Sequence, residues 1–360
     1  MKKSERNEII EKLTQIGKDV IQAVERSEIP KIEIPSRTTS NIVYDPEYLC
    51  YVIGDKKVKR SAGNIRHIRR LAQLLRVARF CKEEMQKSLR HTTKRELYYI
   101  SESWEKGLKF DEQVESDNII EDIEAMIGRP REDFRIIPNP RGSIYGDITL
   151  RYTTPKGDVK EVNCLDTPDG QAIGPRISEA EIIDCKADKV IAIETSGMYN
   201  RLMEEGAYHK FNAILVNLEG QASRATRRMI KRIHELLEIP VYIFTDGDPW
   251  GLHIAMVIMA GSAKSAHINR QLATPDAKWI GVTASDIKNY KLRSDKLKDV
   301  DYKRIKELSK DPRYKKDERL KKELELWKNL GKKAEQQALL RYGFEYVVEK
   351  YLPTKFKELG

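Results

Sequence analysis

The sequence contains little cysteine and no long hydrophobic run. Its 4 cysteines, spread over 360 residues, form no CxxC pair, which argues against a zinc knuckle or a disulfide framework and is typical of a reducing compartment. No stretch approaches the roughly 18 apolar residues of a membrane-spanning helix, and the N-terminus lacks the apolar core of a signal peptide. We therefore expect a cytoplasmic protein that does not associate with membranes.

A nucleotide-binding loop is also missing. No GxxxxGK[ST] motif occurs, so we expect that this chain does not itself bind ATP. Charge, in contrast, is abundant: Lys and Arg number 66 against 56 for Asp and Glu, giving a formal net charge of +10. A basic balance of this kind favours a polyanionic partner such as nucleic acid. The length predicts more than one domain.

The N-terminal part, residues 1–62, is expected to be a helical arm with an irregular lead-in. An apolar stripe runs along residues 1–29 at helical spacing, formed by Ile9, Leu13, Ile16, Val20 and Val24. This stripe could pack on the chain's own body, on a twin subunit or on a different subunit. Residues 30–62 are expected to be irregular because prolines interrupt them.

Three helices and a hairpin are predicted within residues 63–153. A basic helix starts after Asn64, a second near Thr93 and a third at SDNIIEDIEAMIG, and the alternating FRIIPNPRGSIYGDITLRY predicts a hairpin with Arg141 at its tip. Together they describe a winged helix-turn-helix domain, in which Arg69, Arg70 and Arg141 would contact DNA. A winged helix that binds protein is the alternative.

Residues 154–360 are predicted to alternate between strands and helices. KVIAIE, NAILVNL and VYIFTD are short buried-type strands, and each is followed by a helical pattern. This order predicts a small parallel sheet that binds ligands at the carboxyl ends of its strands. The fold class is therefore multidomain, with α+β and α/β parts. Beyond Asp286 the charged helices are interpreted as a solvated face.

Acidic residues follow two of these strands. Glu194 closes one, Asp246 closes another, and Asp248 comes two residues later. If the strands are neighbours, the three carboxylates meet at one edge, and hard oxygen ligands suit Mg²⁺. Gly247 would allow a sharp turn between the aspartates, and Pro249 suits the first position of the next helix. Taken alone, DGD is also a common turn.

An acid-ended strand followed by DxD after a later strand resembles the Toprim domain of topoisomerases, primases and related nucleases. ETSGMYNRL, GQASRATRRMIKRI and FTDGDPWGLHIAMVIMAGS resemble the A subunit of archaeal topoisomerase VI, a type IIB enzyme related to the meiotic double-strand-break protein. The likeness covers nearly the whole chain, although Ala222 stands where the family has proline. It implies that Glu194, Asp246 and Asp248 bind Mg²⁺, in a homodimer that forms an A2B2 heterotetramer with an ATPase B subunit.

The segment TKRELYYISESW offers two candidate nucleophiles, Tyr98 and Tyr99. Leu97, Ile100, Ser101 and Trp104 share one helical face, so Tyr99 is expected to point to solvent beside Arg95, with Tyr98 on the flank. The resemblance likewise implies that Tyr99 attacks DNA phosphorus, assisted by Arg95. Thr93 and Glu96 match a capping box, so we interpret Glu96 as structural.

The leading hypothesis is the DNA-cleaving and rejoining subunit of an ATP-dependent type IIB topoisomerase acting on double-stranded DNA. The alternatives are a double-strand-break transesterase or a Toprim nuclease without strand passage, and a non-catalytic DNA-binding module. The presence of every residue type that the chemistry needs argues against the last alternative.

Overall fold

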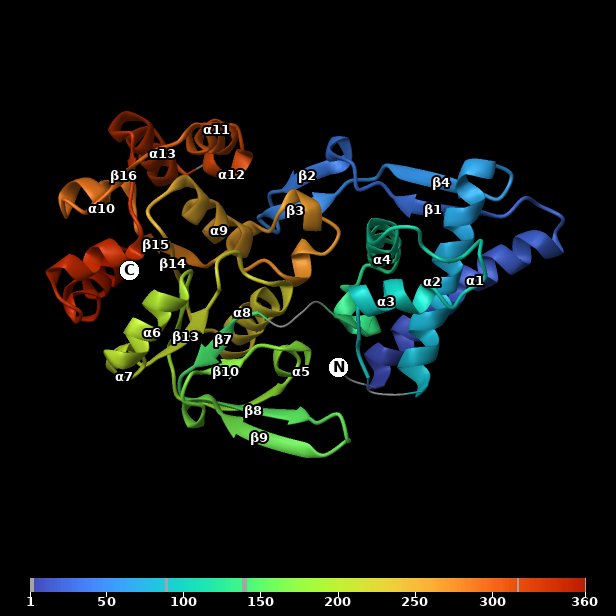
Figure 1. Ribbon diagram of the computed structural model, residues 1–360, viewed down its shortest axis with the longest axis horizontal. Helices are drawn as coiled ribbons and strands as arrows, with labels where there is room; N and C mark the ends of the chain where they lie inside the picture. The colour runs from blue at the N-terminus through green and yellow to red at the C-terminus, as the bar shows by residue number, and fades with distance from the viewer. Residues whose placement is uncertain (1–2, 88–89, 138–140, 316, 360) are drawn as a thin grey trace.

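The computed structural model describes residues 3–87, 90–137, 141–315 and 317–359. Residues 138–140, part of the expected hairpin, lie outside the described residues. Figure 1 shows a mainly helical N-terminal body at the right and a larger α/β body at the left. Each has its own hydrophobic core, one drawn from Ile9 to Ile136 and the other from Ile144 to Leu352. Among the described helices, none is long and apolar enough to cross a membrane.

The helical body is built around its first and second helices. Its elements are α1 (Lys3–Glu25), α2 (Ile65–Lys87), α3 (Lys94–Ser101), α4 (Gln113–Ile127), the antiparallel pair β1 (Lys31–Pro35) and β4 (Lys57–Ser61), and the parallel pair β5 (Thr92–Thr93) and β6 (Ile136–Ile137). The start of the apolar stripe on α1 is buried in this core, at Ile9, Leu13 and Ile16. The arm therefore packs on its own body, although Val24 stays 60% exposed.

The expectation that residues 30–62 are irregular is wrong. Besides β1 and β4, this stretch forms the hairpin β2 (Ile42–Asp45) and β3 (Cys50–Ile53). The prolines are compatible with strands because Pro35 is the last residue of β1 and Pro46 lies in the turn after β2. In β1, Ile32 and Ile34 are buried while Lys31 and Glu33 are exposed, which is the alternation of a half-buried strand.

The predicted hairpin with Arg141 at its tip is also wrong. The two strands on either side of Gly146, β7 (Ser143–Tyr145) and β8 (Ile148–Thr153), do not pair with β6, which pairs with β5. Instead β7 joins the large sheet, while β8 pairs with β9 (Val159–Asn163) and β11 (Glu181–Cys185). Alternation marks a strand but does not identify its partner. The cores thus divide between Ile136 and Ile144, ahead of the boundary expected after residue 153.

The α/β body contains the small parallel sheet that the sequence predicts. The six-stranded order is β10 (Gln171–Ala172), β7, β13 (Ala213–Asn217), β12 (Lys189–Ile193), β14 (Val241–Phe244) and β15 (Lys278–Gly281). The last four strands are parallel to one another, and β7 is antiparallel to β13. The helices that follow them include α6 (Ser196–Glu204), α8 (Arg224–Leu237), α9 (Pro249–Ala260) and α10 (Ala284–Asn289).

The C-terminal region is more than the solvated face that its charge suggested. Its elements are β16 (Asp295–Lys296), α11 (Asp299–Leu308), α12 (Pro312–Lys315), α13 (Glu318–Leu330), β17 (Lys332–Lys333) and α14 (Leu352–Leu359). Two further short helices of the α/β body, α5 (Pro175–Ser178) and α7 (Ala207–Lys210), come earlier in the chain. Trp327 and Tyr351 are fully buried in the α/β core. On α13, Leu320, Leu324 and Trp327 are buried, whereas charged residues such as Lys322, Glu325 and Lys328 are exposed.

Candidate active site

Two of the expected acids lie side by side because their strands are neighbours. β12 and β14 pair in parallel, with Ile193 opposite Phe244, so Glu194 and Asp246 both leave the sheet at its carboxyl edge. The backbone N–H of Asp246 donates to Oε2 of Glu194 at 2.8 Å. This contact confirms the expected adjacency of the two strand ends.

The third acid caps the next helix. Oδ1 of Asp248 accepts from the N–H groups of Trp250 at 2.9 Å and Gly251 at 2.7 Å, and Pro249 occupies the first turn of α9 as expected. Gly247 does not adopt the positive φ that glycine permits, although the chain bends at Asp248, and its missing side chain allows a close approach of neighbouring segments. Its N–H donates to the Ala334 carbonyl at 2.7 Å, and a Cβ would lie 2.9 Å from Val282.

The site is poorly solvated and rich in negative charge. Burial, with repulsion from Asp246, raises the pKa of Glu194 to about 8. Burial likewise raises the pKa of Asp246 to about 6, although the N–H of Gln336 opposes the shift, and burial raises the pKa of Asp248. Carboxylates in such surroundings are costly without a cation or a proton. Their chemistry, hard oxygen at one sheet edge, fits a divalent ion.

The three carboxylates share an edge without surrounding a single point. Within the described ranges, no three His, Cys, Asp or Glu side chains are assembled as a group that could hold a metal ion. Asp246 is occupied by Gln336 and Asp248 by the start of α9. Binding of an ion by all three acids would therefore require side-chain rotation.

Sequence reasoning missed a polar residue that joins the two acidic strand ends. Gln336 is fully buried, and its backbone N–H donates to Oδ1 of Asp246 at 2.9 Å. Its side-chain Nε2 donates to the Phe244 carbonyl at 3.0 Å, and Oε1 accepts from the hydroxyl of Thr195 at 2.9 Å. It therefore connects the residue after Glu194 with Asp246. Gln336 and Gln337 lie in a charged segment, and no sequence pattern there indicated that Gln336 reaches the acidic strand ends.

The tyrosine helix has the orientation that the sequence predicts. Leu97 is buried, whereas Tyr99 is 57% exposed and the Arg95 guanidinium lies 5.8 Å from the centre of its ring. A side-chain hydrogen bond with Tyr99 raises the pKa of Arg95. Tyr98 is half-buried, and its hydroxyl donates to the Asp111 carbonyl at 3.4 Å.

The interpretation of Glu96 as structural is supported by its contacts. The N–H of Thr93 donates to the Glu96 carboxylate at 2.6 Å, and the N–H of Glu96 donates to the Thr93 hydroxyl at 3.1 Å, which is the expected capping box. This cap starts α3 on the helical body, whereas Glu194 and Asp246 belong to the α/β body. Within one chain, the tyrosine and the acids are therefore carried by different bodies.

The candidate DNA-binding arginines differ in their surroundings. Arg69 donates to Asp111 at 2.7 Å and Arg70 is exposed on the same helix. The side chain of Arg141 is 54% exposed, and its guanidinium donates to the Glu219 carbonyl of the α/β body. Arg70 and Arg141 are thus accessible to a polyanion, while Arg69 is partly neutralised by Asp111 and Arg141 by Glu219, whose carboxylate lies 4.0 Å away.

Two family models match the chain. The model for the Toprim domain of the topoisomerase 6 A subunit and Spo11 matches residues 189–356, and the model described as "Type IIB DNA topoisomerase" matches residues 69–136. The first match covers both acidic strand ends and the second covers the tyrosine helix. Fold and site together therefore define the class of type IIB topoisomerase proteins with a Toprim domain.

Similar proteins extend this match to the full chain. The A subunit of type 2 DNA topoisomerase 6 from Methanothermobacter thermautotrophicus is 50% identical over 350 residues, covering 97% of both chains. Its namesakes from Archaeoglobus fulgidus and Natronomonas pharaonis are both 40% identical, covering 100% and 97% of this chain and 99% and 95% of their own. The chain belongs to the family of topoisomerase 6 A subunits and is therefore part of an enzyme.

Proposed function

We propose that this chain cleaves and rejoins double-stranded DNA through a transient phosphotyrosine link, as the A subunit of an ATP-dependent type IIB topoisomerase. The observation that carries the proposal is the exposed Tyr99 beside Arg95, in a chain whose second body gathers acids at a sheet edge. In the cleavage step the Tyr99 hydroxyl gives up its proton and its oxygen forms a bond to phosphorus, while the bond from phosphorus to a sugar oxygen breaks and that oxygen takes up a proton. Rejoining is the reverse step, with the sugar oxygen displacing tyrosine.

Arg95 assists this nucleophile. A tyrosine hydroxyl is a weak nucleophile near neutral pH because its ordinary pKa is about 10. The Arg95 guanidinium contacts Tyr99 on the same helix, and its charge would stabilise both the phenolate and the developing charge on phosphorus. Glu96 is left to cap α3 and takes no part in the chemistry.

Glu194, Asp246 and Asp248 would hold Mg²⁺. The buried acids provide the hard oxygen donors that this ion prefers, and the ion would neutralise charge on the reacting phosphate. Glu194 and Asp246 are already adjacent, so we propose that they form the core of the site and that Asp248 joins by rotating from its cap position. Gln336 keeps Asp246 in place for this purpose.

A homodimer would bring the two halves of the chemistry together. Tyr99 and the acids lie on different bodies of one chain, so we propose that the tyrosine of one protomer faces the acids of its twin. Two such sites would cut the two strands of a duplex. A partner B subunit would supply ATP hydrolysis in an A2B2 assembly, since this chain has no phosphate loop.

DNA would bind across the helical body. We propose that α2, α3 and α4 act as a winged-helix-type unit, with Arg69 and Arg70 on α2 contacting phosphates and Arg141 adding a contact from the α/β body. This unit contains the short parallel pair β5–β6 and not the hairpin that we expected. These contacts supply affinity, whereas the acids supply chemistry.

The test is to trap covalent protein–DNA adducts with denaturant, using the chain assembled with its B subunit in the presence of Mg²⁺. Tyr99→Phe should bind DNA and form no adduct. Tyr98→Phe is the matched control and should form adducts, because a neighbouring helical position points about 100° away. Adducts on Tyr99→Phe would refute the proposed nucleophile. Adducts without ATP-dependent relaxation of supercoiled DNA would favour a transesterase without strand passage.

A further inference from the structure

An exposed tryptophan lies beside the acidic strand ends. Trp250 occupies the first turn of α9, and its backbone N–H donates to Oδ1 of Asp248 at 2.9 Å. The sequence contains 4 tryptophans, all within the described ranges, and Trp104, Trp279 and Trp327 are buried. Trp250, in contrast, is 40% exposed. Tryptophan is highly buried on average, so an indole left open next to a proposed metal ligand points to a contact that DNA could complete.

The direction of α9 places this ring at the carboxyl edge of the sheet. α9 follows β14 and starts directly after Asp246 and Asp248, so its first turn lies at the edge where the acidic strands end. Helical side chains lean toward the N-terminus of their own helix. The Trp250 side chain therefore leans toward this edge and not along the flank of the sheet.

Neighbouring side chains restrain the ring and leave part of it open. The Arg304 guanidinium lies 4.0 Å from the centre of the Trp250 ring, and the His253 ring meets it edge-on with 6.4 Å between the ring centres. Arg304 belongs to α11, which packs against α9 and lies above it in the view of Figure 1. A guanidinium over an indole is an attractive contact. The ring is thus ordered before it binds, which lowers the entropy cost of a further contact.

The surface around Trp250 is more apolar than basic. Arg304 is partly neutralised because Glu307 lies 3.1 Å from it. Val300, one turn before Arg304 on the same flank of α11, is 57% exposed. An indole and a valine beside the acids suit the apolar parts of DNA, its bases and sugars, better than its phosphates.

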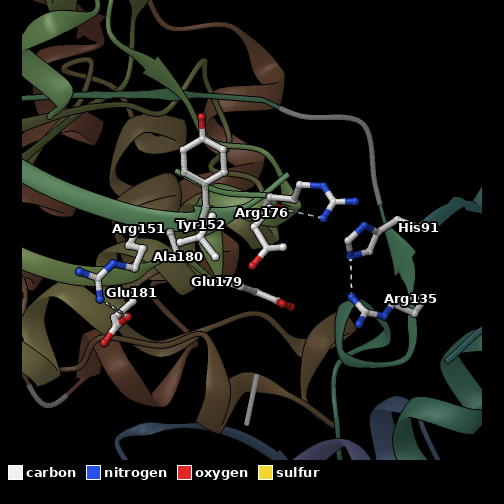
Figure 2. Close-up of a pocket in the computed structure, with 10 residues that line it drawn as sticks. His91, Arg135, Arg151, Tyr152, Arg176, Glu179, Ala180 and Glu181 are labelled. Carbon is white, nitrogen blue, oxygen red and sulfur yellow. Dashed lines mark hydrogen bonds and ion pairs between the residues drawn. The ribbon is translucent and has the colours of Figure 1, made fainter. Parts of the chain in front are cut away.

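The charged pocket at the junction of the two bodies has a different character. Figure 2 shows Arg135 from the helical body facing Arg176 and Glu179 from the α/β body. Glu179 is a charge partner of Arg135, and Glu181 lies 3.4 Å from Arg151. Charges of opposite sign offset one another there, so we assign this pocket to the junction between the bodies.

We propose that Trp250 packs against the sugar and base of the nucleotide next to the phosphate that Tyr99 attacks, and so influences which DNA sequences are cleaved. This proposal rests on the proposed function, which brings that phosphate to the acids of the α/β body. Aromatic rings pack on bases of any type, and apolar side chains that press on a base step favour steps that deform easily. Trp250 would thus select deformable sequences without reading hydrogen bonds.

Tryptophan fluorescence tests the contact without any cleavage. Acrylamide, an uncharged quencher, should quench mainly Trp250 in the free full chain, because the other tryptophans are buried. Trp250→Phe should therefore be quenched weakly. Saturating duplex DNA without Mg²⁺ should lower the quenching of the wild type to the level of Trp250→Phe. Unchanged quenching of the DNA-bound wild type would refute the contact, and weak quenching before DNA is added would show that the twin subunit covers the ring instead.

DNA affinity and cleavage sites test the consequence. Trp250→Ala should bind duplex DNA roughly 5-fold more weakly, the lower end of the loss for one base–aromatic contact, with an unchanged dependence on salt because no charge is removed. Trp250→Phe should recover most of the affinity. Sequencing of DNA ends attached to trapped protein should show that Trp250→Ala cleaves a less restricted set of sites than the wild type.

Leu236→Ala is the matched control for these measurements. Leu236 is an apolar residue that is 61% exposed near the end of α8, and α8 leads back to the start of β14, at the edge of the sheet opposite the acids. This variant should have wild-type affinity and cleavage sites. An equal loss of affinity in Leu236→Ala and Trp250→Ala would mean that the effect is not specific to the acidic edge.

The remaining outcomes separate this proposal from the proposed function. Wild-type affinity and cleavage sites for Trp250→Ala would overturn the role of the ring, and a loss of unfolding free energy alone would make it a packing residue. If the wild type forms no adduct while DNA still protects Trp250 from acrylamide, the proposed function fails and the contact with DNA is retained. Adducts on the wild type without protection of Trp250 count against the tryptophan alone.

Discussion

Arg224 on α8 donates to the carboxylate of Glu124 on α4, which is 100 residues earlier in the chain and fully buried. The same guanidinium lies 3.1 Å from Glu132, and Arg228, one turn further along α8, donates to Asp133 at 2.6 Å. The helical body and the α/β body are therefore joined by buried ion pairs, together with the hydrogen bond from His267 to Glu124.

Glu124→Gln is expected to destabilise this junction strongly. Removing one member of a buried ion pair leaves the other charge uncompensated and typically costs about 3–5 kcal/mol of unfolding free energy. Urea unfolding at neutral pH measures the loss. Glu318→Gln, which removes the exposed partner of Lys321 on α13, is the matched control and should unfold like the wild type. Equal stability of Glu124→Gln and the wild type would mean that the junction does not depend on this pair.

The junction should also be sensitive to acid. Burial alone would raise the pKa of Glu124, but the Arg224 charge and the His267 hydrogen bond outweigh it and hold the pKa well below its usual range. A depressed folded-state pKa gives stability that is present above the ordinary value of about 4.5 and is lost as pH falls below it. The difference in unfolding free energy between the wild type and Glu124→Gln should therefore shrink between neutral pH and about pH 3.5. A difference that stays constant over this range would contradict the assignment.

Local patterns were sufficient to predict the parts of the fold whose signal is local. β12, β13 and β14 are buried along nearly their whole length, and such apolar runs followed by helical periodicity predicted the parallel sheet and the place of Glu194 and Asp246. The exposure of Tyr99 followed from helical spacing in the same way. In each case a few consecutive residues contain the information.

Pairings between distant segments could not be predicted from such patterns. β7 is only three residues long, and its alternation is equally compatible with a hairpin and with its actual partner β13, some 70 residues later in the chain. Gln336 reaches Asp246 across 90 residues, and nothing in its local sequence marks the contact. The contribution of the charged C-terminal region to the site was missed for the same reason.

Gln336 is predicted to position Asp246 for metal binding. Gln336→Leu removes the side-chain hydrogen bonds to Phe244 and Thr195, which fix the residue whose backbone N–H contacts Asp246. The Mg²⁺ concentration that gives half-maximal cleavage should therefore rise about 10-fold, as is typical when residues behind a metal ligand are changed. DNA affinity should not change. Gln15→Leu, at an exposed position on α1, is the matched control. If Gln336→Leu loses stability but keeps the wild-type Mg²⁺ requirement, the residue is only structural.

Arg95 should accelerate adduct formation without determining DNA affinity. Arg95→Ala leaves the nucleophile in place but removes the cation beside Tyr99, so adducts should form about 100-fold more slowly, the scale seen when one group that stabilises a transition-state charge is lost. Arg95→Lys should recover part of the rate, since it restores a charge but not the planar guanidinium that can contact two oxygens. The measurement is the time course of denaturant-trapped adducts, with DNA affinity determined in parallel. Because Arg95 is exposed and its contact with Tyr99 lies within one helix, the variants should fold normally. A wild-type rate for Arg95→Ala would show that the contact with Tyr99 is incidental, and it would place the activating charge on another group.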